Sequence, residues 1–190
     1  MVRQNKMRDT RGMMAAVAEA KLSLDAFHAR YGQEKPYYEY WDGEAIQKSM
    51  PNGIHGLIQM ILGQLLFEVG LLTASEVRLK LKSAYEPVPD VIASASASIF
   101  PYPTQAFDVA VEILSPSDSF NHLVRKCQKY ELWGIGRVVL INPDSREVWA
   151  MINGNLERTD FIARLGTKFV TASDLWAELD RRLAMFPGLH

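Results

Sequence analysis

Apolar positions recur along this chain at spacings that predict helices in four places. Ser23 is expected to be the N-cap of the second half of the first helix, and Ser173 the N-cap of the last. The second helix is apolar nearly all round, which predicts burial on more than one side. The expected ranges are 13–31, 55–69, 119–133 and the segment DLWAELDRRLAMF after Ser173.

Shorter segments alternate between polar and apolar residues, as half-buried strands do. The stretch YYEYWDGEAIQKSM predicts a two-residue hairpin at Asp42-Gly43, and Asn153-Gly154 predicts another between EVWAMIN and LERTDF. Residues 76–83, EVRLKLKS, predict a strand with one basic face. Strands are also expected near VPDVIAS, in FDVAVEIL and in RVVLINP, whose unbroken apolar run predicts a central position.

This order of elements predicts an α/β (α+β) fold, with a mixed central β-sheet flanked by helices and additional β-hairpins towards the N- and C-terminal ends. With 190 residues and 48% hydrophobic content, a single domain spanning 1–190 is expected. Residues 1–12 carry four basic side chains and are expected to form a flexible N-terminal arm.

The composition narrows the function classes. A net charge of -1 argues against a protein that coats nucleic acid by bulk electrostatics, although a local basic groove remains open. The single cysteine, Cys127, lies on the apolar stripe of a predicted helix, which favours a core position and a reducing compartment. The longest apolar run, residues 57–72, is too short and too polar for a membrane span. A cytoplasmic location is expected.

Glu112 lies in the middle of a strand that otherwise looks buried. In FDVAVEIL it shares one face with Asp108, Ala110 and Leu114, whereas the other face carries Phe107, Val109, Val111 and Ile113. A buried carboxylate without a partner costs several kcal/mol, so a cation, a metal or a shifted pKa must compensate it. A structural salt bridge is the plainer explanation, and a functional acid is the other.

Two further residues favour the functional explanation. Asp90 follows Pro89 at a strand entry, where a distortion can aim a short carboxylate at the neighbouring strand; ordinary turn chemistry is the alternative. Lys126 lies at the edge of the helix stripe formed by Leu123, Cys127 and Tyr130, so it can lean over the sheet or extend into solvent. Two acids on adjacent strands would hold a hard divalent cation, and a lysine beside them would stabilise the charge of a phosphoryl-transfer transition state.

The sequence resembles the Uma2 (DUF820) family of restriction-endonuclease-like proteins, within the PD-(D/E)XK nuclease superfamily. The resemblance covers about residues 20–180 and rests on the order and spacing of several short motifs. They are LSLDAF, YYEYWDGEAI, His55 before a helix, PDV, VEILSPS and KCQKYELWGIGRVVLINP.

The resemblance implies a nuclease fold that depends on Mg²⁺, with Mn²⁺ as a substitute. Asp90 would be the motif aspartate and Glu112 the second acid, both binding metal. The lysine of the superfamily pattern stands two residues after that acid, where this chain has Leu114, so the resemblance implies that Lys126 supplies it from the following helix. Glu39 would be a further metal ligand or would support the ligands.

The remaining candidates are less specific. His55 opens a helix, where it can reach a substrate phosphate or play no chemical role. Arg78, Lys80 and Lys82 can follow a phosphate backbone or form a solvated strand face. The leading hypothesis is an endonuclease that hydrolyses DNA phosphodiester bonds, and a homodimer is compatible with cutting both strands. The alternative is a nuclease fold that no longer cuts and serves as a nucleic-acid-binding or protein-interaction module.

Overall fold

The computed structural model describes residues 21–35 and 37–186. The expected basic arm and the first part of the predicted N-terminal helix lie outside the described residues. Helix α1 (Leu24–Tyr31) begins where predicted, since the Ser23 hydroxyl accepts a hydrogen bond from the amide of Ala26. Phe27 is the buried residue of this short helix and packs on Tyr40.

A mixed sheet of six strands forms the middle layer of the described part of the chain. In spatial order its strands are β3 (Leu72–Ser75), β5 (Val91–Ser94), β6 (Val109–Ile113), β7 (Arg137–Asn142), β8 (Glu147–Ile152) and β9 (Asn155–Arg158). Strands β6 and β7 run parallel and are joined by helix α3 (Phe120–Leu132), whereas the other neighbouring strands are antiparallel. The central place of β7 is as predicted.

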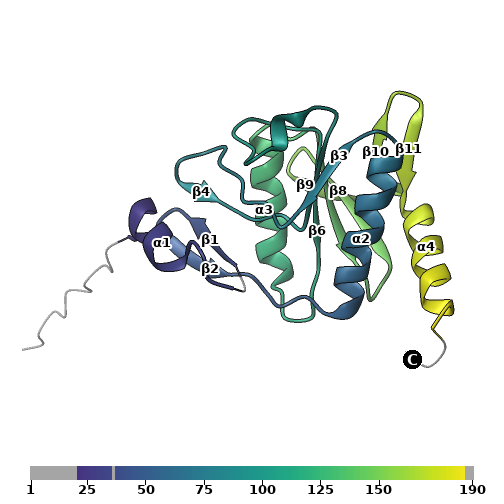
Figure 1. The fold of residues 1–190 in the computed structure, drawn as a ribbon, viewed down its shortest axis with the longest axis horizontal. Coiled ribbons are helices and arrows are strands. Elements are labelled where there is room, and N and C mark those ends of the chain that lie inside the picture. The colour runs from purple at the N-terminus through teal and green to yellow at the C-terminus, as the bar shows by residue number, and fades with distance from the viewer. Residues whose placement is uncertain (1–20, 36, 187–190) are drawn as a thin grey trace, which may run out of the picture.

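Helices cover both faces of this sheet, which Figure 1 shows nearly edge-on. Helices α2 (Gly53–Glu68) and α4 (Ala172–Ala184) lie on one face together with the hairpin of β10 (Phe161–Leu165) and β11 (Lys168–Thr171). Helix α3 lies on the other. The fold class is therefore confirmed. Phe107 was assigned to the wrong face: it precedes β6, outside the strand's alternation, and packs on the α3 side.

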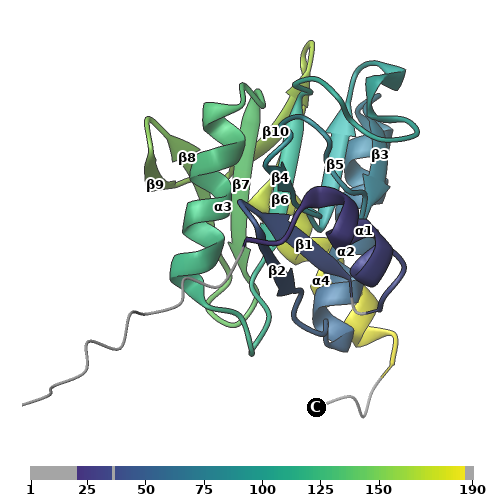
Figure 2. The same ribbon diagram turned by 90° about the vertical axis from the view of Figure 1, so that its left-hand side faces the viewer.

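A second, smaller sheet leans against the α3 side, as Figure 2 shows. Its strands are β2 (Glu44–Gln47), β1 (Tyr38–Trp41) and β4 (Tyr85–Glu86), in that order. The predicted hairpin is confirmed: Asp42 and Gly43 both have positive φ, 46° and 94°, as a tight hairpin turn requires. The Trp41 ring meets the His122 ring of α3 edge-on, with centroids 5.7 Å apart. This contact fixes β1 beside α3.

The strand predicted over residues 76–83 is wrong. The sheet strand is β3, which ends one residue before Glu76, and Glu76 adopts a left-handed conformation with φ of 57° that turns the chain out of the sheet. Residues 77–81 then run without ladder pairing. The alternation nevertheless predicted burial correctly, because Leu79 is fully buried and Val77 and Leu81 pack beside it on the α3-side core.

The expected cap of the last helix is also wrong. Thr171 is the N-cap of α4, in a capping box in which its hydroxyl accepts from the amide of Asp174 and the Asp174 carboxylate accepts from the amide of Thr171. Ser173 lies inside the first turn and donates its hydroxyl to Asp160. The β8–β9 hairpin at Asn153-Gly154 is as expected, whereas the β10–β11 hairpin has no counterpart in the sequence-based prediction.

Candidate active site

The pairing of β5 with β6 brings two acids face to face. Val91 lies opposite Val111 in this antiparallel ladder, and continuing the register by one residue places Asp90 opposite Glu112. Opposed residues of an antiparallel pair point to the same face with Cβ atoms roughly 5 Å apart. The amide of Ile113 donates to Asp90 Oδ2 at 2.7 Å, so β6 itself holds the aspartate in place. The two expected acids therefore converge.

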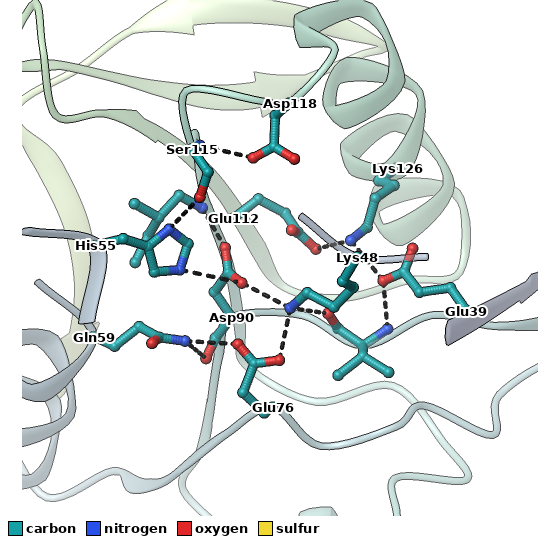
Figure 3. A network of polar contacts seen from close by, with 12 residues as sticks. Glu39, Lys48, His55, Gln59, Glu76, Asp90, Glu112, Ser115, Asp118 and Lys126 are labelled. Carbon is teal, nitrogen blue, oxygen red and sulfur yellow. Dashed lines mark hydrogen bonds and ion pairs between the residues drawn. The ribbon is translucent and has the colours of Figure 1, made fainter. Parts of the chain in front are cut away.

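Lys126 reaches the same place from α3. Its Nζ donates to Glu39 Oε1 at 2.8 Å and lies 2.9 Å from Glu112 Oε1, as Figure 3 shows. Tyr130, one turn further along α3, donates its hydroxyl to Glu112 Oε1 at 2.8 Å. All four side chains are buried. Lys126 points into the site rather than towards solvent; the sequence left both directions open.

Glu39 is positioned by its neighbours on both oxygens. The amide of Val88 donates to Oε1 at 2.8 Å, and the indole of Trp41 donates to Oε2 at 2.9 Å. In the described part of the chain, by contrast, Glu112 Oε2 accepts no hydrogen bond. Both oxygens of Glu39 are thus engaged by protein groups, whereas Glu112 keeps Oε2 for another partner.

A second lysine, which the sequence did not single out, lies on the other side of Asp90. Lys48 follows β2, and its Nζ donates to Asp90 Oδ1 at 2.8 Å, to Glu76 Oε2 at 2.8 Å and to the carbonyl oxygen of Val88 at 2.9 Å. Gln59 of α2 donates to the other Glu76 oxygen at 2.9 Å. Lys48 and Glu76 lie outside the regular strands, so no periodic pattern indicates where their side chains point.

His55 joins the cluster from the first turn of α2, which Asn52 caps. A hydrogen bond of 2.8 Å links its Nδ1 to the Ser115 hydroxyl, just beyond the end of β6. Its Nε2 lies 3.5 Å from Asp90 Oδ1 and has no hydrogen-bond partner among the residues the structure describes. His55, whose role the sequence left open, therefore lies beside Asp90 and presents one buried nitrogen to it.

Burial and mutual charge shift the pKa values of these groups in different directions. Burial raises the pKa of Glu112 to about 8, since Lys126 only partly offsets the desolvation. Asp90 is equally buried, but Lys48 and His55 hold its pKa well below the usual range. Burial of Glu39 is likewise outweighed by Lys126 and Lys48, which lower its pKa. Glu112 is therefore the acid of these three that keeps a proton at neutral pH.

The count of charges adds to the effect of burial on the pKa of Glu112. Four carboxylates meet two ammonium groups in this network, so full ionisation would leave two negative charges without compensation. A cavity of about 200 Å³ lies directly beside them. Asp90, Glu112, Lys126 and His55 all line it, together with His122 of α3, whose pKa burial and the nearby Lys126 lower. The site thus combines an excess of carboxylates over ammonium groups, a free carboxylate oxygen of Glu112 and an adjoining cavity through which a ligand can reach them.

Among the residues that the structure describes, one group of side chains has the geometry of a metal site. One ligand atom each from His55, Glu76 and Asp90 lie within 4.8 Å of one another. The sequence-based pair of metal ligands, Asp90 and Glu112, shares only Asp90 with this group. Asp90 therefore lies between two places where a cation can be held, one towards Glu112 and one towards Glu76.

The three expected nucleic-acid contacts do not form one basic face. The guanidinium of Arg78 is half-buried; it donates to the carbonyl of Tyr38 and lies over the ring of Phe27. Lys80 and Lys82 are exposed, and Lys80 lies over the ring of Tyr102. Arg78 is engaged in holding α1 and β1 together, whereas a contact of the two lysines with nucleic acid stays a prediction.

Comparison with protein families shows what this chain is related to. Residues 24–180 match the family profile of Uma2, described as "Putative restriction endonuclease". The chain belongs to the Uma2 family. The resemblance seen in the sequence motifs is therefore confirmed. No curated protein matches this Uma2 chain.

Solved structures show that the fold is shared. The crystal structure of a putative nuclease belonging to DUF820 from Anabaena variabilis ATCC 29413 matches with a TM-score of 0.70 and 23% identity, over 83% of this chain and 99% of that chain. The cryo-electron-microscopy structure of a DrdV–DNA complex matches with a TM-score of 0.38 and 17% identity, over 70% of this chain and 12% of that chain, which is too weak to carry an argument. Among the described residues of the Uma2 chain, none of the helices has the length and apolar character to cross a membrane.

Proposed function

We propose that this Uma2 protein is a metal-dependent endonuclease that hydrolyses phosphodiester bonds of DNA. The observation that carries the proposal is the opposition of Asp90 and Glu112 on adjacent strands, beside a cavity, in a network where four carboxylates meet only two ammonium groups. A structural ion pair would balance its charges, because an unpaired buried charge is costly. DNA as the substrate follows from the family description, which names restriction endonucleases.

The donor set fits a hard divalent cation. Carboxylate oxygens are the ligands that Mg²⁺ prefers, and Mn²⁺ accepts the same donors. Asp90 and Glu112 would hold the ion, which when bound polarises a phosphoryl oxygen and lowers the pKa of its bound water. One divalent charge would also neutralise the surplus of the network, which is the reason this site suits such an ion.

The chain's own residues have supporting roles in this proposal. Lys126 holds Glu112 by Oε1, so that Oε2 remains available, and Glu39 in turn holds Lys126. His122 lines the cavity with a lowered pKa, so its neutral imidazole is available to accept a proton. Lys80 and Lys82 are the exposed cations that would contact the phosphate backbone, and a homodimer would place one site on each strand of a duplex.

The test is a cleavage assay on supercoiled plasmid and on single-stranded DNA, with Mg²⁺, Mn²⁺ or EDTA. Glu112→Gln and Asp90→Asn should each lower the cleavage rate at least about 100-fold, since each removes one charged metal ligand. Lys126→Ala should also lose activity. Glu157→Gln removes an exposed acid on β9 and serves as the matched control with the wild-type rate.

Two results would contradict the proposal. Cleavage that persists unchanged in Glu112→Gln and Asp90→Asn would show that these acids do not carry the reaction. Absence of cleavage by the folded wild-type protein on every substrate, combined with DNA binding that depends on metal, would assign it instead to the class of nuclease folds that bind without cutting.

A further inference from the structure

Lys48 lies inside the group of side chains that has the geometry of a metal site. Its ammonium has three hydrogens, and the structure gives it three oxygen acceptors: Asp90 Oδ1, Glu76 Oε2 and the Val88 carbonyl. The side chain is almost entirely buried, and the two carboxylates raise its pKa in spite of that burial. A single positive charge thus occupies the centre of this oxygen cluster, as Figure 3 shows.

The surrounding donors are those of a metal site rather than of an ordinary salt bridge. Besides the two carboxylates, His55 directs a buried Nε2 towards Asp90, and this nitrogen has no hydrogen-bond partner within the described ranges. The three ammonium hydrogens of Lys48 are all taken by oxygen acceptors, so Lys48 does not engage this nitrogen. Two carboxylates and one imidazole form a ligand set that first-row transition metals bind well.

The backbone is also strained at Glu76, which carries one of these donors. Glu76 has φ of 57°, a left-handed conformation that is strained for a residue with a side chain and is common at functional sites. Gln59 then holds the resulting carboxylate orientation by donating to Glu76 Oε1, and it also donates to the Asp90 carbonyl at 3.1 Å. The position of Glu76 is therefore enforced from both backbone and side chain.

We infer that Lys48 is a built-in cation that takes the place of a second metal ion beside Asp90, so that the site binds one divalent ion, between Asp90 and Glu112. This inference rests on the proposed function. The ammonium supplies one permanent positive charge to Asp90 and Glu76 and fixes Asp90 Oδ1, so the place left for an ion is the Glu112 side of the aspartate. The structure thereby assigns Lys48 as a positioning residue of the nuclease site.

Removal of the positive charge of Lys48 should therefore create a second metal site. Lys48→Ala leaves the carboxylates of Asp90 and Glu76 and the imidazole of His55 around an open space, with no cation among them. The probe is Mn²⁺ itself, whose binding stoichiometry is measured by electron paramagnetic resonance of the free ion and by calorimetry. Wild type should bind one ion per chain and Lys48→Ala two.

Controls separate the new site from the first. The double variant Lys48→Ala/Glu76→Gln should return to one ion, because the opened site has lost a charged ligand. Lys168→Ala, which removes an exposed lysine on β11, should bind one ion like wild type. If Lys48→Ala does not fold without metal, Lys48→Gln keeps a hydrogen-bond donor while removing the charge, and it should also bind two ions.

Each outcome decides between distinct claims. Binding of one ion by wild type and by the folded Lys48 variants alike would overturn the inference and leave the proposed function standing. Binding of two ions by wild type would also overturn the inference, because the Lys48 ammonium would then not take the place of the second ion. Binding of none by wild type would instead contradict the proposed metal-dependent function itself.

Discussion

Each charged residue of the site is held by partners from distant parts of the chain. Lys126 is the clearest case: it comes from α3 and contacts Glu39 of β1 and Glu112 of β6. Burial disfavours its charge, but these two carboxylates outweigh the burial and raise its pKa. Removal of one partner from such a buried group leaves the others uncompensated, which is the costly case for ion pairs.

Replacement of this lysine should therefore reduce stability as well as activity. Lys126→Met keeps the aliphatic stem and removes the charge, and it should lower the free energy of unfolding by about 3–5 kcal/mol. Urea denaturation at neutral pH measures the change. Arg125→Met, on the exposed side of the same helix, should change stability by less than about 0.5 kcal/mol. Equal effects of the two substitutions would show that Lys126 is not held by an essential ion pair.

Site residues on regular elements, or within a family motif as Asp90 is, could be proposed from the sequence, whereas other residues between elements could not. Spacing placed Lys126 at the edge of the α3 stripe, with its role implied by the family resemblance, and alternation placed Glu112 on a buried strand. Lys48 and Glu76 were missed because they lie at the ends of β2 and β3, where side-chain direction depends on the path of the chain. The left-handed backbone of Glu76 has no signature in its side chain, since glycine and asparagine are the usual residues there.

At the scale of elements, hairpins with strong turn signals formed as expected. Alternation of polar and apolar residues, without a turn signal, predicted β-strands less well. Asp42-Gly43 specifies a turn because both residues accept positive φ. In residues 77–81, alternation predicted which side chains are buried but not that the backbone would pair, because an extended chain packed on a core shows the same pattern as a strand. The β10–β11 hairpin carries a short turn at Gly166 that was not recognised.

The last helix offers a test between two cap residues. The sequence favours Ser173, whereas the structure places Thr171 at the N-cap in reciprocal hydrogen bonds with Asp174. Thr171→Ala should lower the free energy of unfolding by about 1 kcal/mol, the usual value for loss of a capping hydroxyl. Ser173→Ala removes only the exposed hydrogen bond to Asp160 and should cost less. Thermal unfolding of both variants shows which substitution destabilises the protein more. A larger loss of stability in Ser173→Ala would contradict the assignment of Thr171 as the N-cap.

At the scale of the whole molecule, the site lies where the layers of the fold meet. The α2 side contributes His55 and Gln59, the α3 side contributes Lys126 and Tyr130, and the central sheet contributes the acid Glu112 between them. The small sheet, which lies in front of the central sheet in Figure 2, adds Glu39 from β1. The fold class was predictable because element order and periodicity determine the layers. The convergence of these side chains was not predictable, because it depends on how α2 and the small sheet approach the same end of β6.

Burial raises the pKa of Glu112 to about 8, which favours the protonated carboxyl at neutral pH when no ion is bound. A divalent ion must displace this proton. Below the raised pKa, each increase of one pH unit should therefore tighten binding by about tenfold, and above it the affinity should level off. Acid conditions thus weaken the metal site, and mildly basic conditions favour it.

Calorimetric titration of Mg²⁺ into the wild-type protein, at pH values from about 6 to about 9, tests the central claim most directly. The expected result is one ion per chain, with an affinity that rises with pH up to about 8 and a proton released on binding. Glu112→Gln should bind far more weakly and without the pH dependence, and Glu157→Gln should behave as wild type. Absence of binding to the wild-type protein, or equal binding by Glu112→Gln, would contradict the claim that these acids form a metal site.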